Sequence, residues 1–185
     1  MRHLRFFYLN RGLLASPPLL LALFLTYHEA KNGVMVWAIG LLIFFLGLLG
    51  RIWAQQHLHY RLKMPMTLTR TGPYALVRNP IYVFNILTSV GLTVVSRVVW
   101  MVPITIIWSA VVFAIVVREE EQRISKVFGP PYLAYLNEVP RWIPRSFRAP
   151  LELVNEHLAP SIKAEMYNLL YLIPFVIKEA LRHIA

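Results

Sequence analysis

The longest apolar stretches of the chain lie at positions 34–54 and 98–117. A helix needs roughly 20 predominantly apolar residues to cross the hydrocarbon core of a bilayer. The first stretch carries a single charge, Arg51, near its end, and the second carries none. Both are therefore predicted to be membrane-spanning helices. Within the first, Gly47 and Gly50 favour close packing against a neighbouring helix.

Two shorter apolar stretches, at 13–27 and 81–95, extend the same pattern. The first contains Pro17 and Pro18, which are expected to start or kink a helix because proline lacks a backbone N–H. The second is followed almost directly by the next apolar stretch, which predicts a helical hairpin. The expected fold is an all-α, polytopic membrane bundle with four spanning helices, or five if a further segment near the C-terminus also crosses.

Residues 145–185 have a different character. Prolines at 140, 144 and 150 surround the start of this region, and Met166–Ile177 is an apolar run of only 12 residues, too short to span a bilayer. This run is predicted to be an interfacial or core-docked helix, with a re-entrant or crossing helix as the alternative. The expected division is a membrane domain at 1–144 and an amphipathic, interfacial extension at 145–185.

The basic residues are distributed unevenly around these stretches. The chain has 19 Lys and Arg against 9 acidic residues, and the bases lie beside apolar spans, as on the cytoplasmic face of a membrane protein. We therefore do not expect a nucleic-acid partner. Bases are frequent before position 13, across 51–80 and after 117, and rare in the two intervening loops. The positive-inside rule then predicts a multi-pass protein with both termini and the 51–80 segment in the cytoplasm.

The segment 71–84, TGPYALVRNPIYVF, holds an unusual density of polar and turn-forming residues at the start of an apolar helix. Asn79 suits a helix N-cap and Pro80 the first helical position. Three side chains around this helix start are not explained by turn or cap chemistry: Tyr74, Arg78 and Tyr82. They are candidate site residues, although a cytoplasmic anchor and interface aromatics remain alternatives.

A second polar cluster, Glu119–Glu121, follows the last long apolar stretch. Acidic residues at a helix C-terminus would oppose the helix dipole, so the helix is expected to continue to Phe128 and stop at Gly129. A solvated collar of charge is the alternative to a binding role. His57 and His59 are spaced two apart without a nearby carboxylate, and the chain has no cysteine, so no metal site is predicted.

Read together, the two clusters resemble the isoprenylcysteine carboxyl methyltransferase family, with its bacterial and phospholipid-methyltransferase relatives. The resemblance covers about 55–144 and rests on the order and spacing of these residues: Gly72-Pro73-Tyr74, Arg78-Asn79-Pro80-Ile81-Tyr82, Glu120-Glu121 with Ile124, Phe128-Gly129, Tyr132, Tyr135, Val139-Pro140 and Ile143-Pro144.

This resemblance implies an integral-membrane methyltransferase that uses S-adenosylmethionine in a cytoplasmic pocket and releases S-adenosylhomocysteine. Carried over by position, the residues implied to bind the cofactor are His59, Leu68, Tyr74, Asn79, Pro80, Tyr82 and Glu120, with Glu120 and Arg78 as the catalytic candidates. The expected partners are the bilayer and a lipid or lipidated small molecule.

Two positions depart from the family pattern. Asn79 replaces a more familiar histidine, and Val116 stands where eukaryotic members carry an arginine thought to hold the substrate carboxylate. Carboxyl O-methylation is the expected reaction. Because Val116 replaces the arginine, an isoprenylcysteine carboxylate is not the expected acceptor. Phospholipid N-methylation and a non-catalytic membrane subunit are the alternatives.

Overall fold

The computed structural model describes residues 6–7, 9–63, 67–145 and 157–182, with residues 59–63 described by their backbone alone. The described residues form an all-α structure without a strand. Its elements in chain order are α2 (Arg11–Ala15), α3 (Pro17–Phe24), α4 (Gly33–Lys63), α5 (Pro73–Leu76), α6 (Pro80–Val95), η1 (Val99–Met101), α7 (Val102–Phe128), α8 (Pro130–Glu138), α9 (Leu158–Met166), η3 (Tyr167–Leu172) and α10 (Ile173–Arg182).

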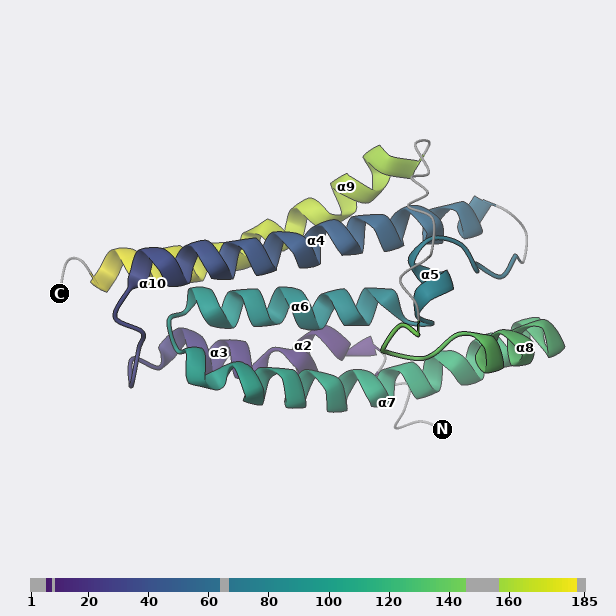
Figure 1. The fold of residues 1–185 in the computed structure, drawn as a ribbon, viewed down its shortest axis with the longest axis horizontal. Coiled ribbons are helices and arrows are strands. Elements are labelled where there is room, and N and C mark those ends of the chain that lie inside the picture. Colours follow the sequence, from purple (N-terminus) through teal and green to yellow (C-terminus); the bar gives the residue numbers. More distant parts are fainter. Residues whose placement is uncertain (1–5, 8, 64–66, 146–156, 183–185) are drawn as a thin grey trace.

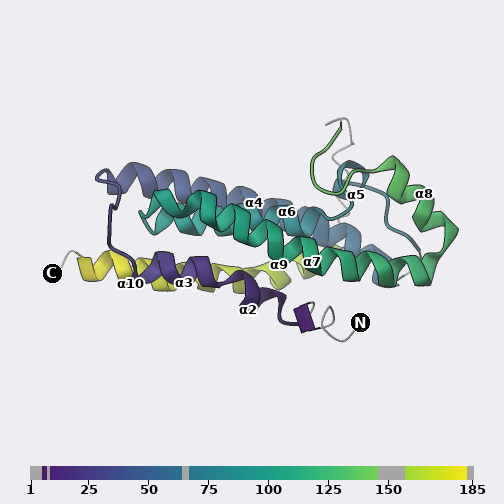
Figure 2. The same ribbon diagram turned by 90° about the horizontal axis from the view of Figure 1, so that it is seen from below.

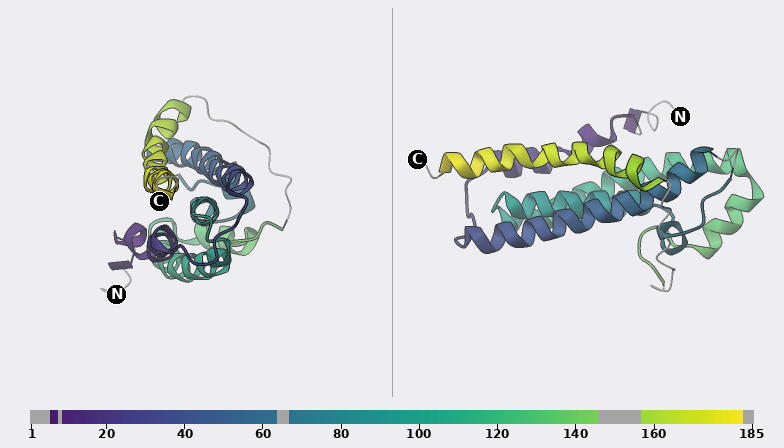
Figure 3. Two further views of the ribbon diagram at one scale, coloured as in Figure 1. Left: turned by 90° about the vertical axis from the view of Figure 1, so that its left-hand side faces the viewer. Right: turned by 90° about the horizontal axis from the view of Figure 1, so that it is seen from above.

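The helices form an elongated bundle in which successive segments run back and forth along the long axis (Figure 1). We call the end that carries α5 and α8 the site end, and the end that carries the loops at 25–32 and 96–98 the far end. We call α9, η3 and α10 together the C-terminal segment. It runs alongside α4, and Figure 2 shows it on the same side of the bundle as α3. Viewed end-on, α6 occupies the middle of the bundle (Figure 3).

Glycines allow α4 and α6 to pack closely. A Cβ added at Gly47 would lie 2.8 Å from the backbone nitrogen of Thr88, and one at Gly91 would lie 2.5 Å from the backbone nitrogen of Phe44. A Cβ at Gly50 would collide with the ring of Phe84. The prediction that Gly47 and Gly50 serve helix packing is therefore confirmed, as small residues let two backbones approach.

Two helical segments are long and apolar enough to cross a membrane, Gly33–Leu58 and Val99–Phe128, and Pro80–Val95 is a shorter apolar helix. The expected hairpin between α6 and α7 is present. The expected stop at Gly129 is also confirmed, since α7 ends at Phe128 and Gly129 has a φ of 59°. The apolar stretch at 13–27 is broken at Ser16 into α2 and α3, as Pro17 and Pro18 predict.

The C-terminal segment is docked on the bundle. Arg51 of α4 makes two hydrogen bonds to the carboxylate of Glu165, at 2.6 and 3.0 Å. Phe175 is buried against α3, α4 and α6 residues. At the far end, Lys178 donates to the carbonyl oxygens of Ala22, Leu25 and Ser96. The segment thus packs against the bundle as a core-docked helix would, and whether it also enters a membrane stays a prediction.

The expectation that both termini are cytoplasmic stays a prediction, and the described ends of the chain lie toward opposite ends of the bundle. The amino-terminal α2 starts toward the site end, whereas α10 ends at the far end (Figure 1). Charge counting treats the last basic residues as part of a cytoplasmic tail. In the structure Lys178 and Arg182 instead pair with Glu29 of the far-end loop, and Glu179 pairs with Arg97.

Candidate active site

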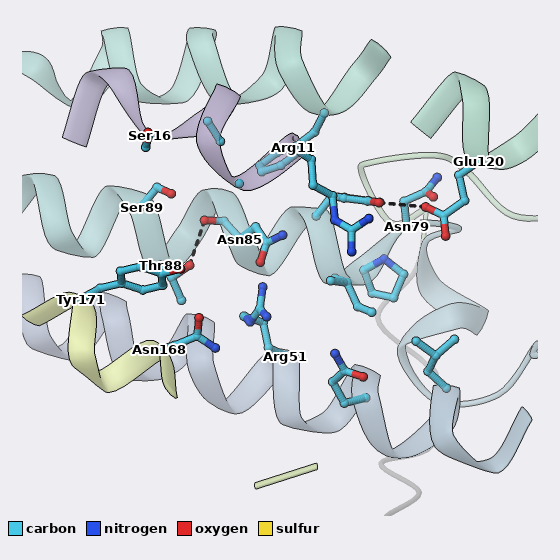
Figure 4. A pocket seen from close by; sticks show the side chains of 18 of the residues that line it. Arg11, Ser16, Arg51, Asn79, Asn85, Thr88, Ser89, Glu120, Asn168 and Tyr171 are labelled. Atoms are coloured by element: carbon cyan, nitrogen blue, oxygen red, sulfur yellow. Dashed lines mark hydrogen bonds between the residues drawn. The ribbon is translucent and has the colours of Figure 1, made fainter. Parts of the chain in front are cut away.

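A cavity of about 560 Å³ opens inside the bundle between α2, α3, α4, α6, α7, α8 and the C-terminal segment. This volume is in the range of small-molecule and cofactor pockets. Residues of its site-end half come from the 68–82 region, α7 and α8: Leu68, Thr69, Tyr74, Arg78, Asn79, Pro80, Tyr82, Glu120, Ile124, Tyr132 and Tyr135. Its inner half reaches between α3, α4, α6 and the C-terminal segment (Figure 4).

The structure brings together most of the residues proposed from the sequence. Seven of them line this one cavity: Leu68, Tyr74, Arg78, Asn79, Pro80, Tyr82 and Glu120. The eighth, His59, lies in the part of α4 whose side chains fall outside the described structure. The two sequence clusters, about 40 residues apart in the chain, therefore meet in space.

Glu120 and Tyr82 form the direct contact between the clusters. The hydroxyl of Tyr82 donates to Oε2 of Glu120 at 2.9 Å, and the Tyr82 ring packs on Phe113 with centroids 5.2 Å apart. The other carboxylate oxygen, Oε1, has no hydrogen-bond partner within the described part of the chain. Because Glu120 is half-buried and lines the cavity, it presents an acceptor to anything bound there.

Glu121 has a different environment from its neighbour. Its carboxylate is buried and contacts Arg141 at 2.6 and 3.2 Å and Nε of Arg78 at 3.4 Å. Arg78 also donates to the carbonyl of Leu136 at 3.2 Å. Arg78 thus lines the cavity while linking the start of α6 to α7 and α8.

Asn79 occupies the N-cap position of α6, but its side chain does not cap the helix. The main-chain carbonyl of Asn79 already accepts from the N–H groups of Tyr82 and Val83. Its side-chain amide donates to the buried carboxylate of Glu121 at 3.3 Å. The prediction of a side-chain cap is therefore wrong: the side chain is turned with Nδ2 toward Glu121 of α7, and Oδ1 accepts from none of the first N–H groups of α6. Pro80 does occupy the first helical position, as expected.

His57 holds the turn that starts α5. Its Nδ1 lies 2.8 Å from Oγ1 of Thr71, and its ring is buried beside Trp53. Gly72 has a φ of 55°, and a Cβ at this position would collide with the His57 ring. Only glycine fits both requirements, since left-handed backbone strains other residues. The turn that carries Tyr74 is thereby fixed on α4.

Tyr132 and Tyr135 belong to the family pattern, but their place in the site was not predicted. The hydroxyl of Tyr135 donates to the main-chain oxygen of Tyr74 at 2.7 Å. Burial, with smaller contributions from neighbouring charges, raises the pKa of both phenols above the usual value. Both therefore stay protonated near neutral pH and act as hydrogen-bond donors. In the sequence, the three-residue spacing of the two tyrosines already places them on one face of a helix, which could have indicated a shared role.

Other lining residues missed from the sequence are polar side chains within apolar helices. They include Arg11 of α2, Arg51 and Gln55 of α4, Asn85, Thr88 and Ser89 of α6, and Asn168 and Tyr171 of η3. A polar side chain inside a membrane-spanning helix usually marks a functional or internal position. That signal was present in the sequence, but it does not say which side chains face each other.

Comparison with known proteins connects this arrangement to a family. A sequence model described as phospholipid methyltransferase matches residues 34–131. The chain is 29% identical over 129 residues to the cobalt-zinc-cadmium resistance protein CzcN of Cupriavidus metallidurans, covering 68% of this chain and 58% of that protein. It is 29% identical over 107 residues to the nickel-cobalt-cadmium resistance protein NccN of Alcaligenes xylosoxydans xylosoxydans, covering 58% and 49%.

These matches cover only part of the relatives. The aligned region spans 58% and 49% of the length of the two resistance proteins. No solved structure matches the chain. The family match includes α4, α5, α6 and α7, which supply most of the cavity wall.

Proposed function

The chain belongs to the phospholipid methyltransferase family, and we propose that it is an integral-membrane enzyme that methylates a lipophilic acceptor with S-adenosylmethionine. The observation that carries this proposal is the cavity in which Glu120 and Tyr82 meet the start of α6. The site joins polar groups at one end to apolar walls at the other, which suits a polar cofactor and an amphiphilic acceptor.

The residues of the site-end half fit this cofactor chemically. Oε1 of Glu120 faces the cavity and can accept from an ammonium group or from ribose hydroxyls. The N-terminal turn of α6, beginning at Pro80, offers a positive dipole end and backbone N–H groups to a carboxylate. His59 is proposed to join this set, together with Leu68, Tyr74 and Asn79.

The reaction needs little acid–base chemistry from the protein. The activated methyl group comes with the bound sulfonium, so the protein mainly orients the acceptor and excludes water. We propose that Glu120 fixes the cofactor end of the site and that Arg78 keeps its wall in place through Glu121 and the Leu136 carbonyl.

Carboxyl O-methylation is the proposed reaction, and phospholipid N-methylation is the second candidate, favoured by the description of the matching family. The two are separated by incubating the purified protein with a total lipid extract and methyl-labelled S-adenosylmethionine. O-methylation gives label that mild base releases as methanol, whereas N-methylation gives label that stays with the headgroup. Absence of any transfer would contradict catalysis and favour a non-catalytic membrane subunit.

We also propose a membrane orientation. Among the described residues, Lys and Arg are more frequent at the site end (Arg11, Arg61, Lys63, Arg70, Arg78, Arg118, Arg123, Lys126, Arg141 and Arg145) than at the far end (Lys31, Arg97, Lys178 and Arg182). The positive-inside rule then places the site end in the cytoplasm.

The C-terminal segment is proposed to be a further crossing. Every exposed residue from Ala164 to Leu181 is uncharged. The charged residues in this range, Glu165, Lys178 and Glu179, face the bundle and are paired. At 1.5 Å per residue these 18 positions cover about 27 Å, close to the thickness of a hydrocarbon core. Internal pairing explains why this crossing is hard to recognise in the sequence.

Cysteine labelling tests this topology, because the chain contains no cysteine. Single substitutions Asn32→Cys and Leu181→Cys are expected to react with a membrane-impermeant maleimide from outside intact cells. Asn137→Cys in α8 is expected to react only after permeabilisation. If Leu181→Cys reacted only after permeabilisation, as Asn137→Cys should, while Asn32→Cys reacted from outside, a crossing by the C-terminal segment would be contradicted.

A further inference from the structure

The inner half of the cavity contains polar groups that the proposed cofactor site does not use. Asn85 lies five residues beyond Pro80 in α6, or about 7 Å deeper into the bundle. Arg51 of α4 and Asn168 of η3 reach the same part of the cavity. Figure 4 shows Arg51 extending toward Asn85, with Asn168 beside them. We call these three residues the inner polar cluster.

Arg51 is held in place and still has hydrogen-bonding capacity. Its Nε and Nη2 bind the two oxygens of Glu165, whose side chain is 2% exposed. Asn168 donates to the same carboxylate at 2.6 Å. Within the described structure, Nη1 of Arg51 has no partner. The Nη1–Nη2 edge of the guanidinium therefore remains for a ligand, and this edge matches a carboxylate or phosphate.

Asn85 is the second unsatisfied group. Its side-chain amide makes no hydrogen bond to any described residue, and the same is true of the Ser89 hydroxyl one turn further along α6. Both side chains are half-buried and line the cavity, so their polar atoms are available to a bound molecule.

Apolar side chains surround the cluster on the side away from Glu120. They come from four segments: Leu19 and Leu23 of α3, Phe44 of α4, Leu92 of α6 and Phe175 of α10. The cavity thus has a polar site-end half, a polar cluster in the middle and an apolar inner end. This order fits an amphiphile whose headgroup points toward Glu120 and whose chain lies among these apolar residues.

The charge of the wall favours an acidic headgroup. Three arginines line the cavity, Arg11, Arg51 and Arg78, and Glu120 is the one acidic residue among the described lining residues. Glu165 and Glu121 offset Arg51 and Arg78 from behind the wall, but Arg78 shares Glu121 with Arg141. An anionic group placed at the cluster therefore meets Nη1 of Arg51 and the side-chain amide of Asn85, neither of which is hydrogen-bonded to a described residue.

We propose that the inner polar cluster binds the acidic headgroup, a carboxylate or a phosphate, of the membrane amphiphile that is methylated. Arg51 and Asn85 contact this headgroup, and the C-terminal segment positions Arg51 through Glu165 and Asn168. The identification of the ligand as the methyl acceptor rests on the proposed function, whereas the preference of the cavity for acidic amphiphiles does not. Acceptor selection is thereby assigned to α4, α6 and the C-terminal segment.

The test compares amphiphiles that differ in the headgroup, using native mass spectrometry of the full chain released from micelles. The probes are decanoate, dihexanoyl phosphatidic acid and the neutral decanol. We expect at least one acidic probe to bind about tenfold more tightly than decanol, as for hydrogen bonds to charged groups. Preference for decanoate or for the phosphatidic acid identifies the headgroup. Equal binding of all three would overturn the proposal.

Two variants place the preference at the cluster. Asn85→Ala removes no side-chain hydrogen bond to the described chain, so it should fold normally and lose most of the acidic preference. The double variant Arg51→Gln/Glu165→Gln removes the guanidinium without leaving a buried charge unpaired and should do the same. Asn137→Ala on exposed α8 is the control and should behave as the unmodified protein. An unchanged preference in Asn85→Ala and in the double variant would contradict the assignment.

Measuring S-adenosylhomocysteine binding in parallel separates this proposal from the proposed function. Asn85→Ala should bind S-adenosylhomocysteine with unchanged affinity, because Asn85 lies outside the site-end half. Failure of the proposed function appears as a lack of S-adenosylhomocysteine binding by the unmodified protein. Failure of the present proposal appears as normal S-adenosylhomocysteine binding without any preference for acidic amphiphiles.

Discussion

Replacing Glu120 with glutamine is expected to weaken S-adenosylhomocysteine binding about tenfold to a hundredfold while the protein stays folded. A hydrogen bond to a charged group contributes about 1.5–3 kcal/mol, and about 1.4 kcal/mol is a factor of ten in affinity. Glutamine keeps the shape of the side chain and its contact with Tyr82 but loses the negative charge offered to the ligand. Calorimetric titration in detergent measures the change.

The exposed carboxylate of Glu138 provides the matched control. Glu138 pairs with Arg70 at the surface of α8 and does not line the cavity. Glu138→Gln should therefore leave S-adenosylhomocysteine affinity unchanged. Unchanged affinity in Glu120→Gln, or a loss that accompanies unfolding, would remove Glu120 from the cofactor site.

The neighbouring substitution, Glu121→Gln, is expected to lower the free energy of unfolding by about 3–5 kcal/mol, as for other broken buried ion pairs. Glu121 is buried between Arg78 and Arg141, and its loss leaves both guanidinium groups without their carboxylate partner. The start of α6 and the segment after α8 would lose their common anchor. Denaturant or thermal unfolding of the purified protein measures the loss.

Glu119→Gln is the comparison for this effect. Glu119 is also buried, but its partner Arg123 is 46% exposed and lies one turn away on the same helix. Pairs with a largely exposed partner contribute about 0–1 kcal/mol, so Glu119→Gln should change stability little. Equal effects of the two substitutions would show that Glu121 has no special anchoring role. The three consecutive glutamates thus have three distinct expected phenotypes.

Local features of the fold could be predicted because their causes are local. The break at Pro17 and Pro18, the first-turn position of Pro80 and the stop at Gly129 each follow from backbone chemistry at one position. Gly47 could be assigned to helix packing for the same reason. The predicted side-chain cap by Asn79 fails because its amide donates instead to Glu121, which is 42 residues away in the chain.

The position of the C-terminal segment could not be predicted, because its decisive contacts are distant in sequence. Glu165 binds Arg51 across 114 residues, and Lys178 binds carbonyl groups of three separate elements. If the charged residues of this segment are counted as loop charges, the sequence suggests an extension outside the bundle. Because they pair with residues of the bundle, the segment can lie along α4 with an uncharged outer face.

The candidate site shows the same division. The order and spacing of the motifs identified the residues of the site-end half, and the structure brings seven of them to one cavity. The inner polar cluster combines residues from α4, α6 and η3 that belong to no sequence motif. Its composition became visible only when these three elements were placed together.

If the cavity beside Glu120 binds the methyl donor, titration of the purified, folded protein with S-adenosylhomocysteine will show saturable binding with one ligand per chain. We expect this binding to be competed by S-adenosylmethionine and weakened in Glu120→Gln but not in Glu138→Gln. A folded protein that binds neither S-adenosylhomocysteine nor S-adenosylmethionine would contradict this assignment of the cavity.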